Sequence, residues 1–217
     1  MIDFKSNLDV KTPKEIFAEI NERFIGAVMM HGQFADYFDF LGLKGFKRMH
    51  EYQHIAESLE RRKVCRYFIN HHNQLIDDVF DGKVNVIPDA WRTAKRLSVG
   101  KSTKQKAVED GFVEYHNWES ETKEVYEQYA HTLRENGHVA DAMFVECLVE
   151  DVSEELKTVE CMINDLISTG YDMVYITEIQ SEIHDKYKKK MKGIGLGMIS
   201  TTIPVIAVVA GIILSYW

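Results

Sequence analysis

The stretch Ala56-Glu57-Ser58-Leu59-Glu60 places two carboxylates three residues apart inside a segment that has the period of a helix. Residues three apart lie on the same face of an α-helix. The rest of that face is apolar or carries an amide, at Met49, Gln53, Val64 and Phe68. Carboxylates in a protein core must be paired, protonated or bound to a cation. The sequence therefore predicts that Glu57 and Glu60 point into a core and meet a partner there.

Three other long segments repeat apolar residues every three or four positions, and each carries one metal-ligand residue on its inward stripe. These residues are His31, Glu119 and Glu155. In an antiparallel pair of helices, residues equidistant from the turn lie at the same height. His31 and Glu57 are symmetric about residue 44, and Glu119 and Glu155 are symmetric about residue 137. Each pair is therefore expected to be level.

Turn and capping signals divide the chain into five expected helices. Thr12 followed by Pro13 and Glu15 has the pattern of a helix start. In this pattern the side chain of the capping residue and that of the third helical residue each accept a hydrogen bond from the other's backbone N–H. The segment 81–101 has turn residues, a proline and no sustained period, and it is long enough to cross the full length of a bundle. The expected helices span residues 13–41, about 46–78, 102–135, 138–168 and 172–191.

Composition narrows the classes of function. The chain has 217 residues, three prolines and a formal net charge of −8. This composition favours one helical domain with an appendage and argues against nucleic acid as a partner. The cysteines at positions 65, 147 and 161 lack the spacing of a zinc site and are expected to be reduced thiols. The first residues are too polar for a signal peptide.

The C-terminal segment differs in kind from the rest. Residues 193–217 contain no charged side chain, and a run of this length can span a bilayer with some tilt. Lysines precede it at positions 186, 188, 189, 190 and 192, and Tyr216-Trp217 closes it, as in a membrane span. We therefore expect a single-pass C-terminal anchor in a lipid bilayer, with residues 1–192 on the cytoplasmic side. The alternative is an apolar helix buried in a soluble oligomer.

A metal ion would explain four acidic residues in one core. No lysine or arginine is expected on the inward faces beside Glu57, Glu60, Glu119 and Glu155, so as bare anions they would repel one another. Carboxylate and imidazole ligands suit iron or manganese best, with zinc as a lesser option. Ligands projecting from facing helices are a common way for a bundle core to hold two such ions.

The chain from Asn21 to Leu166 resembles the ferritin-like di-iron carboxylate proteins. The resemblance is carried by the long crossover and by Tyr37-Phe38-Asp39, Ala56-Glu57-Ser58-Leu59-Glu60, Trp118-Glu119 and Val152-Ser153-Glu154-Glu155. It implies two irons, with Glu57 between them and with Glu60, Glu119, Glu155 and His31 each holding one iron or the other. It also implies oxidation of Fe(II) by oxygen or peroxide. Departures from the family pattern are Ala27 in place of a glutamate, Glu60 in place of a histidine, and Val152 where the last motif would begin.

Each candidate ligand also has a purely structural interpretation. His31 could be a hydrogen-bonded core residue, and Glu57 and Glu60 could face outward. The outward partners would be Arg61, Arg62 or Lys63 for Glu57 and Glu60, and Lys123 for Glu119, with Glu155 at an exposed edge. His50 and His54 are expected to be solvated or to cap a helix.

The sequence thus predicts an all-α, ferritin-like antiparallel four-helix bundle over residues 1–170. A connecting amphipathic helix follows over 171–192, and a transmembrane anchor over 193–217. The expected function is that of a membrane-tethered metal-binding protein that oxidises Fe(II), with metal ions and lipid as partners and a homo-oligomer left open. The alternative is a metal-free bundle that acts as a scaffold or interaction module on the same anchor.

Overall fold

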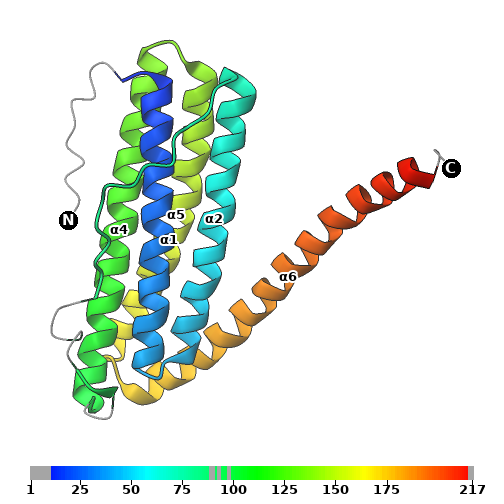
Figure 1. Cartoon of the computed structure of the whole chain (residues 1–217). Helices are drawn as coiled ribbons and strands as arrows, with labels where there is room; N and C mark the ends of the chain where they lie inside the picture. The colour runs from blue at the N-terminus through cyan, green and yellow to red at the C-terminus, as the bar shows by residue number, and fades with distance from the viewer. Residues whose placement is uncertain (1–10, 88–90, 92–93, 97–98, 215–217) are drawn as a thin grey trace.

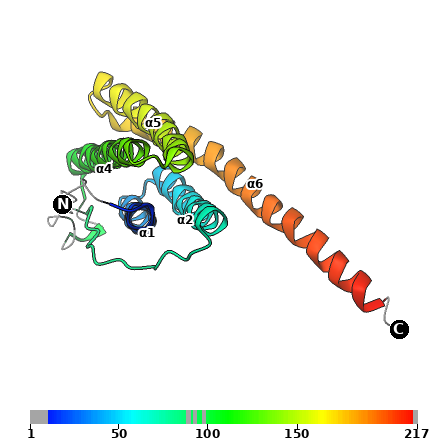
Figure 2. The same ribbon diagram turned by 90° about the horizontal axis from the view of Figure 1, so that it is seen from above.

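The computed structural model describes the backbone of residues 11–87, 91, 94–96 and 99–214, and the side chains of this set up to residue 194. The long helices of this part are α1 (Pro13–Phe40), α2 (Lys44–His72), α4 (Lys101–Glu135), α5 (Val139–Ser168) and α6 (Met173–Leu214). The first four stand side by side as an antiparallel bundle, and α6 leaves its base at an angle (Figures 1 and 2). The predicted all-α bundle is confirmed.

Local sequence explains where the first hairpin begins and ends. The Thr12 hydroxyl accepts a hydrogen bond from the Glu15 backbone N–H at 3.3 Å, and the Glu15 carboxylate accepts one from the Thr12 N–H at 2.7 Å. Gly42 supplies the positive φ of 78° that the turn needs. Helix α2 ends at His72, because Asn73 adopts the left-handed conformation with φ of 53°. The prediction that this helix reaches residue 78 is therefore wrong.

The crossover between α2 and α4 runs along the outer face of α1 (Figure 2). The Asn21 amide donates to the Asp78 carboxylate at 3.0 Å. The Gln33 side chain donates to the Val84 carbonyl at 2.7 Å, and Arg96 donates to the Asp39 carbonyl at 2.8 Å. These side chains hold the connection at successive heights along α1, so it crosses the length of the bundle as predicted.

The described core consists of two apolar clusters. One lies toward the α1–α2 turn and includes Phe34, Phe38, Phe46, Phe112 and Ile183. The other lies toward the α4–α5 turn and includes Phe17, Ile20, Val64, Phe68 and Val145. Side chains of both clusters line a cavity of about 400 Å³ that also contains the acidic residues of interest. The acids therefore lie at mid-height, between two dry layers.

Helix α6 packs against the first turn of α2. A Cβ added at Gly45 would lie 1.8 Å from the carbonyl oxygen of Gln180, so only glycine permits this approach. Within the part of the chain that the structure describes, we find no helix with the length and apolar character needed to cross a bilayer. The expected anchor falls on residues 193–217, of which the side chains from residue 195 onward lie outside the described residues.

Candidate metal centre

His31 lies at mid-height on the inward face of α1 and is fully buried. Its Nδ1 atom lies 2.9 Å from Nδ1 of His50, a hydrogen-bond distance between two buried rings. Its Nε2 atom is buried and has no hydrogen-bond partner among the described residues. Burial lowers the pKa of His31 to about 3, so the ring is neutral and Nε2 can act as a metal ligand.

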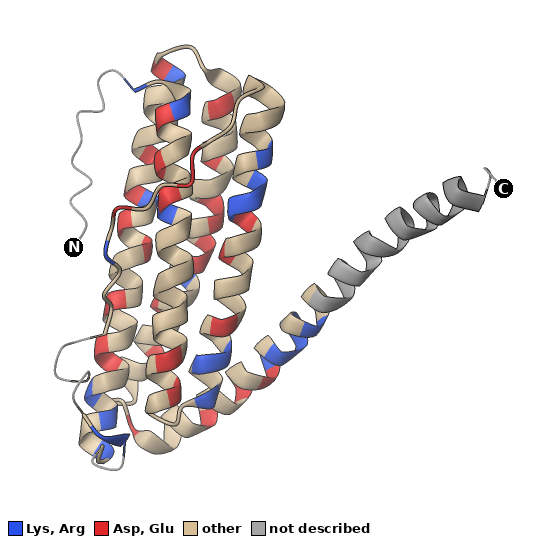
Figure 3. Cartoon of the chain, viewed as in Figure 1, with Lys and Arg blue, Asp and Glu red and all other residues tan. Residues whose placement is uncertain are grey.

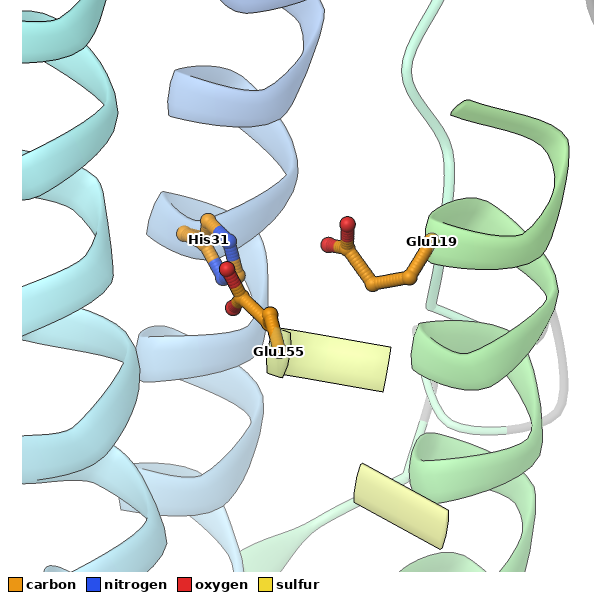
Figure 4. A group of neighbouring side chains, drawn as sticks. All are labelled: His31, Glu119 and Glu155. Carbon is orange, nitrogen blue, oxygen red and sulfur yellow. The ribbon is translucent and has the colours of Figure 1, made fainter. Parts of the chain in front are cut away.

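Glu119 of α4 and Glu155 of α5 face His31 from across the bundle (Figure 4). One ligand atom from each of the three residues can be chosen so that all lie within 4.8 Å of one another. One imidazole nitrogen and two carboxylate oxygens form a donor set that suits iron, manganese or zinc. The orphaned Nε2 atom provides a separate sign that these residues fit a metal ion, because a buried unpartnered acceptor is costly.

Glu155 is held in place by donors from two other helices. The Tyr115 hydroxyl and the Gln53 side-chain amide both donate to its Oε1 atom. Burial raises the pKa of the Glu155 carboxyl, while these two hydrogen bonds and Lys190 oppose the rise. The carboxylate is thereby oriented before any ion arrives, which is what outer partners of a metal ligand do.

Glu119 is 5% exposed, which confirms that it points inward rather than toward Lys123. Burial raises the pKa of its carboxyl strongly, with further contributions from Glu155 and Glu57. Arg23 opposes this rise. In a metal-free protein, such a group is stabilised in its protonated form.

Arg23 corrects the expectation that no cation faces the acids. It is 3% exposed and lines the cavity. Its Nε donates to the Thr122 hydroxyl at 2.8 Å, and its guanidinium donates to the Trp118 carbonyl at 2.8 Å. The guanidinium also lies 4.1 Å from the centre of the Trp118 ring. A permanent positive charge is therefore built into the wall beside Glu119.

Glu57 and Glu60 behave differently from each other. Glu57 lines the cavity, and burial together with Glu155, Glu60 and Asp151 raises the pKa of its carboxyl strongly. The Glu60 side chain is 34% exposed and forms an ion pair with Lys63 at 2.5 Å. Glu60 thus has the outward pairing that the alternative interpretation of the sequence proposed, although its side chain still borders the cavity.

The exposed side chains that line the cavity come from α2, α5 and α6 and include Lys63, Asp151 and Lys190. Helix α6 contributes to the wall through Tyr187 and Lys190. The Lys190 ammonium lies 5.1 Å from the ring centre of Tyr187 and also 5.1 Å from that of Tyr52. The helix that leads to the C-terminal tail therefore forms part of the site.

Sequence reasoning missed Arg23 and His50. His50 is 1% exposed and stacks on Phe38, so the expectation that it is solvated is wrong. The helical spacing indicated that His50 points inward, because it follows the buried Phe46 by four residues on the same helix face. Arg23 likewise precedes Ala27 by four residues. Spacing alone does not decide the direction of such residues, because polar side chains next to an apolar stripe usually reach solvent.

Comparisons with known proteins report on the fold. No known protein-family profile matches the chain, and no curated protein sequence matches it. Among solved structures, an engineered closed form of the Archaeoglobus fulgidus ferritin matches with a TM-score of 0.64 and 15% sequence identity. The match covers 81% of this chain and 96% of the ferritin chain. The chain has a ferritin-like fold.

Proposed function

We propose that this protein binds a divalent metal ion of the iron class between α1, α4 and α5 and that Fe(II) bound there is oxidised. The observation that carries the proposal is the buried, unpartnered Nε2 atom of His31, which shares its surroundings with the carboxylates of Glu119 and Glu155. Glu57 lines the cavity that Glu119 and Glu155 also line, and it is the fourth ligand of the proposed set. The ferritin-like fold supports iron over zinc.

The chain's own residues would prepare the ligands and control access. His50 orients the His31 ring, and Tyr115 and Gln53 orient the Glu155 carboxylate. Ions and a small oxidant would enter past the exposed lining residues of α2, α5 and α6 and reach positions that the ligands leave free. Bound Fe(II) would be the substrate and would supply the electron to oxygen or peroxide.

Metal content tests this proposal directly. The full-length protein, stripped with a chelator, is dialysed against Mn(II) in air or Fe(II) without oxygen, and bound metal and melting temperature are measured. We expect bound metal and a higher melting temperature. Glu119→Gln should abolish binding, whereas Glu124→Gln, an exposed position on the same helix, should not change it. Absence of bound metal and of any thermal shift would refute the proposal.

A metal-free scaffold is the second candidate function, and specific contacts favour it. Glu155 accepts hydrogen bonds from Tyr115 and Gln53, Glu60 pairs with Lys63, and Arg23 lies in the wall beside Glu119. In that case these partners and water would satisfy the acids without a metal. The same metal measurement separates the two functions, because the scaffold would melt at one temperature with or without Mn(II).

We also propose that the C-terminal segment tethers the protein to a membrane, with residues 1–170 as the bundle, 171–192 as the connecting helix and 193–217 as the anchor on a cytoplasmic domain. The support is the uncharged sequence of the last segment and the exposed lysines before it, which Figure 3 shows along α6. Flotation with vesicles of mixed neutral and anionic lipid should carry the full chain but not a chain ending at residue 192. Full solubility without detergent would contradict the tether.

A further inference from the structure

We propose that Arg23 occupies the place of a second metal ion, so that each chain holds a single divalent ion rather than a pair. This inference rests on the proposed function, because it concerns the number of ions at the same site. Arg23 lies in the cavity wall on α1, two helical turns before His31. Arg23 therefore brings a positive charge to the α1 side of the cavity, where a dinuclear centre would need another anionic ligand.

Helix α1 offers no carboxylate to the cavity. The α1 residues that line it, within the described part of the chain, are Arg23, Phe24 and Ala27. Ala27 lies one turn from both Arg23 and His31 and presents only a methyl group. A second ion held within about 4 Å of the first needs carboxylates to clamp both. On this side of the cavity, the second ion would instead meet a guanidinium.

The charges in the cavity balance with one ion. Glu60 already pairs with Lys63, and the side chains of Asp151, Glu154 and Lys190 in the lining are exposed to solvent. The less exposed charged groups of the lining are then the carboxylates of Glu57, Glu119 and Glu155 and the guanidinium of Arg23, which also lies 3.8 Å from the carboxylate of the exposed Glu121. Three negative charges and one positive charge leave an excess of two negative charges, which a single divalent ion neutralises. A second divalent ion would leave two uncompensated positive charges beside two apolar clusters, which is costly.

The Arg23 charge is fixed in both state and position. A guanidinium does not deprotonate in a protein, so it cannot yield to a metal ion by losing a proton. Its bonds to Thr122 and the Trp118 carbonyl hold it against α4. A Cβ added at Gly26 would lie 2.9 Å from the Trp118 ring, so this glycine lets the ring pack closely on α1 beneath the guanidinium.

The decisive measurement is the number of Mn(II) ions bound per full-length chain, by calorimetric titration and metal analysis, together with the electron paramagnetic resonance spectrum. We expect one ion per chain and the hyperfine pattern of isolated Mn(II). Two ions per chain, or the spectrum of an exchange-coupled pair, would overturn the inference while leaving the proposed function intact. No bound ion would overturn the proposed function and the inference with it.

Substitution of Arg23 tests the role of its charge. Arg23→Gln removes a positive charge beside the ion and should tighten Mn(II) binding about tenfold or more. Arg23→Lys keeps the charge and should bind as the natural protein does. Equal affinity in the Gln and Lys variants, with each shown to be folded by its melting curve, would refute the charge argument.

A double variant asks whether a second ion can be restored. Arg23→Gln combined with Ala27→Glu removes the guanidinium and adds a carboxylate one turn from His31. The four carboxylates would then balance two divalent ions, and we expect two Mn(II) ions per chain. A folded double variant that still binds one ion would show that charge does not set the number of ions, which would overturn the inference.

Discussion

The Nδ1 atoms of His31 and His50 lie 2.9 Å apart in the core, so one ring must donate the proton and the other must accept it. Because Nδ1 makes this contact, the buried and unpartnered Nε2 of His31 is the nitrogen available to a metal ion beside Glu119 and Glu155. For that nitrogen to carry a lone pair, the proton of the neutral His31 ring must reside on Nδ1. His50 is then the acceptor that selects the binding tautomer.

Replacing His50 should therefore weaken metal binding without removing a ligand. His50→Phe keeps an aromatic ring between Phe34 and Phe38 but leaves His31 without an acceptor. We expect Mn(II) affinity to fall about 10- to 100-fold by calorimetric titration, and the free energy of unfolding to fall by about 1–3 kcal/mol. His54→Phe, at an exposed position one turn away, is the matched control. Unchanged affinity in His50→Phe would refute the tautomer role.

Tyr115 provides a test of how Glu155 is oriented. Tyr115→Phe keeps the ring, whose centre lies 5.3 Å from that of His31, and removes the hydroxyl that donates to Glu155. A hydrogen bond to a charged group contributes about 1.5–3 kcal/mol, so Mn(II) affinity should fall at least about tenfold. Tyr129→Phe removes a hydroxyl that donates to Glu19 instead and should leave the affinity unchanged. Equal affinities in both variants would contradict the orientation of Glu155.

The metal-free protein should become less stable as pH rises toward neutrality because of its buried acids. The pKa of Glu119 is raised from its usual 4.5, mainly by burial, so the folded state binds a proton that the unfolded state releases. Its stabilising contribution is complete below the unfolded pKa and is lost as pH rises through the folded pKa. Glu119→Gln should therefore raise the melting temperature of the metal-free protein at pH 8 but not at pH 4. An equal effect at both pH values would refute this explanation.

The buried histidine acts in the opposite direction at low pH. The pKa of His31 falls from 6.5 to about 3 on folding, mainly because burial disfavours its charged form. The unfolded chain therefore takes up a proton that the folded chain does not, and stability is lost as pH falls from 6.5 toward about 3. His31→Gln should reduce this acid destabilisation in thermal melts between those limits. An unchanged slope of stability against pH would show that another group is responsible.

The packing of α6 on α2 can be tested with glycine substitutions. A side chain at Gly45 would collide with the Gln180 backbone, so Gly45→Ala should push α6 away and lower the free energy of unfolding by about 2 kcal/mol or more. Gly193→Ala, where no atom lies within 4 Å of the added carbon, should be neutral or slightly stabilising. Chemical denaturation curves that coincide for the two variants would contradict the close approach of α6.

Helix placement could be predicted from the sequence because it depends on local signals. The Thr12 and Glu15 cap, the Asn136-Gly137 turn and the 3.6-residue period are readable from neighbouring residues, and the structure agrees with them. The inward directions of His31 and Glu119 followed from the same period. The end of α2 was misplaced because the left-handed conformation of Asn73 competes with a helix pattern that continues past it.

Tertiary structure decided which charges meet. Helical period shows which face a residue occupies, but not the rotation and height at which one hairpin meets the other. The packing of the two hairpins brings Glu155 close to His31 and places Arg23 beside Glu119, whereas Glu60 forms an ion pair with Lys63. Electrostatic balance depends on distances between helices far apart in the chain, because Coulomb energies fall with separation and rise with burial. The sequence determined the bundle and its supply of acids, and only the packed fold determined which of them are left for a metal ion.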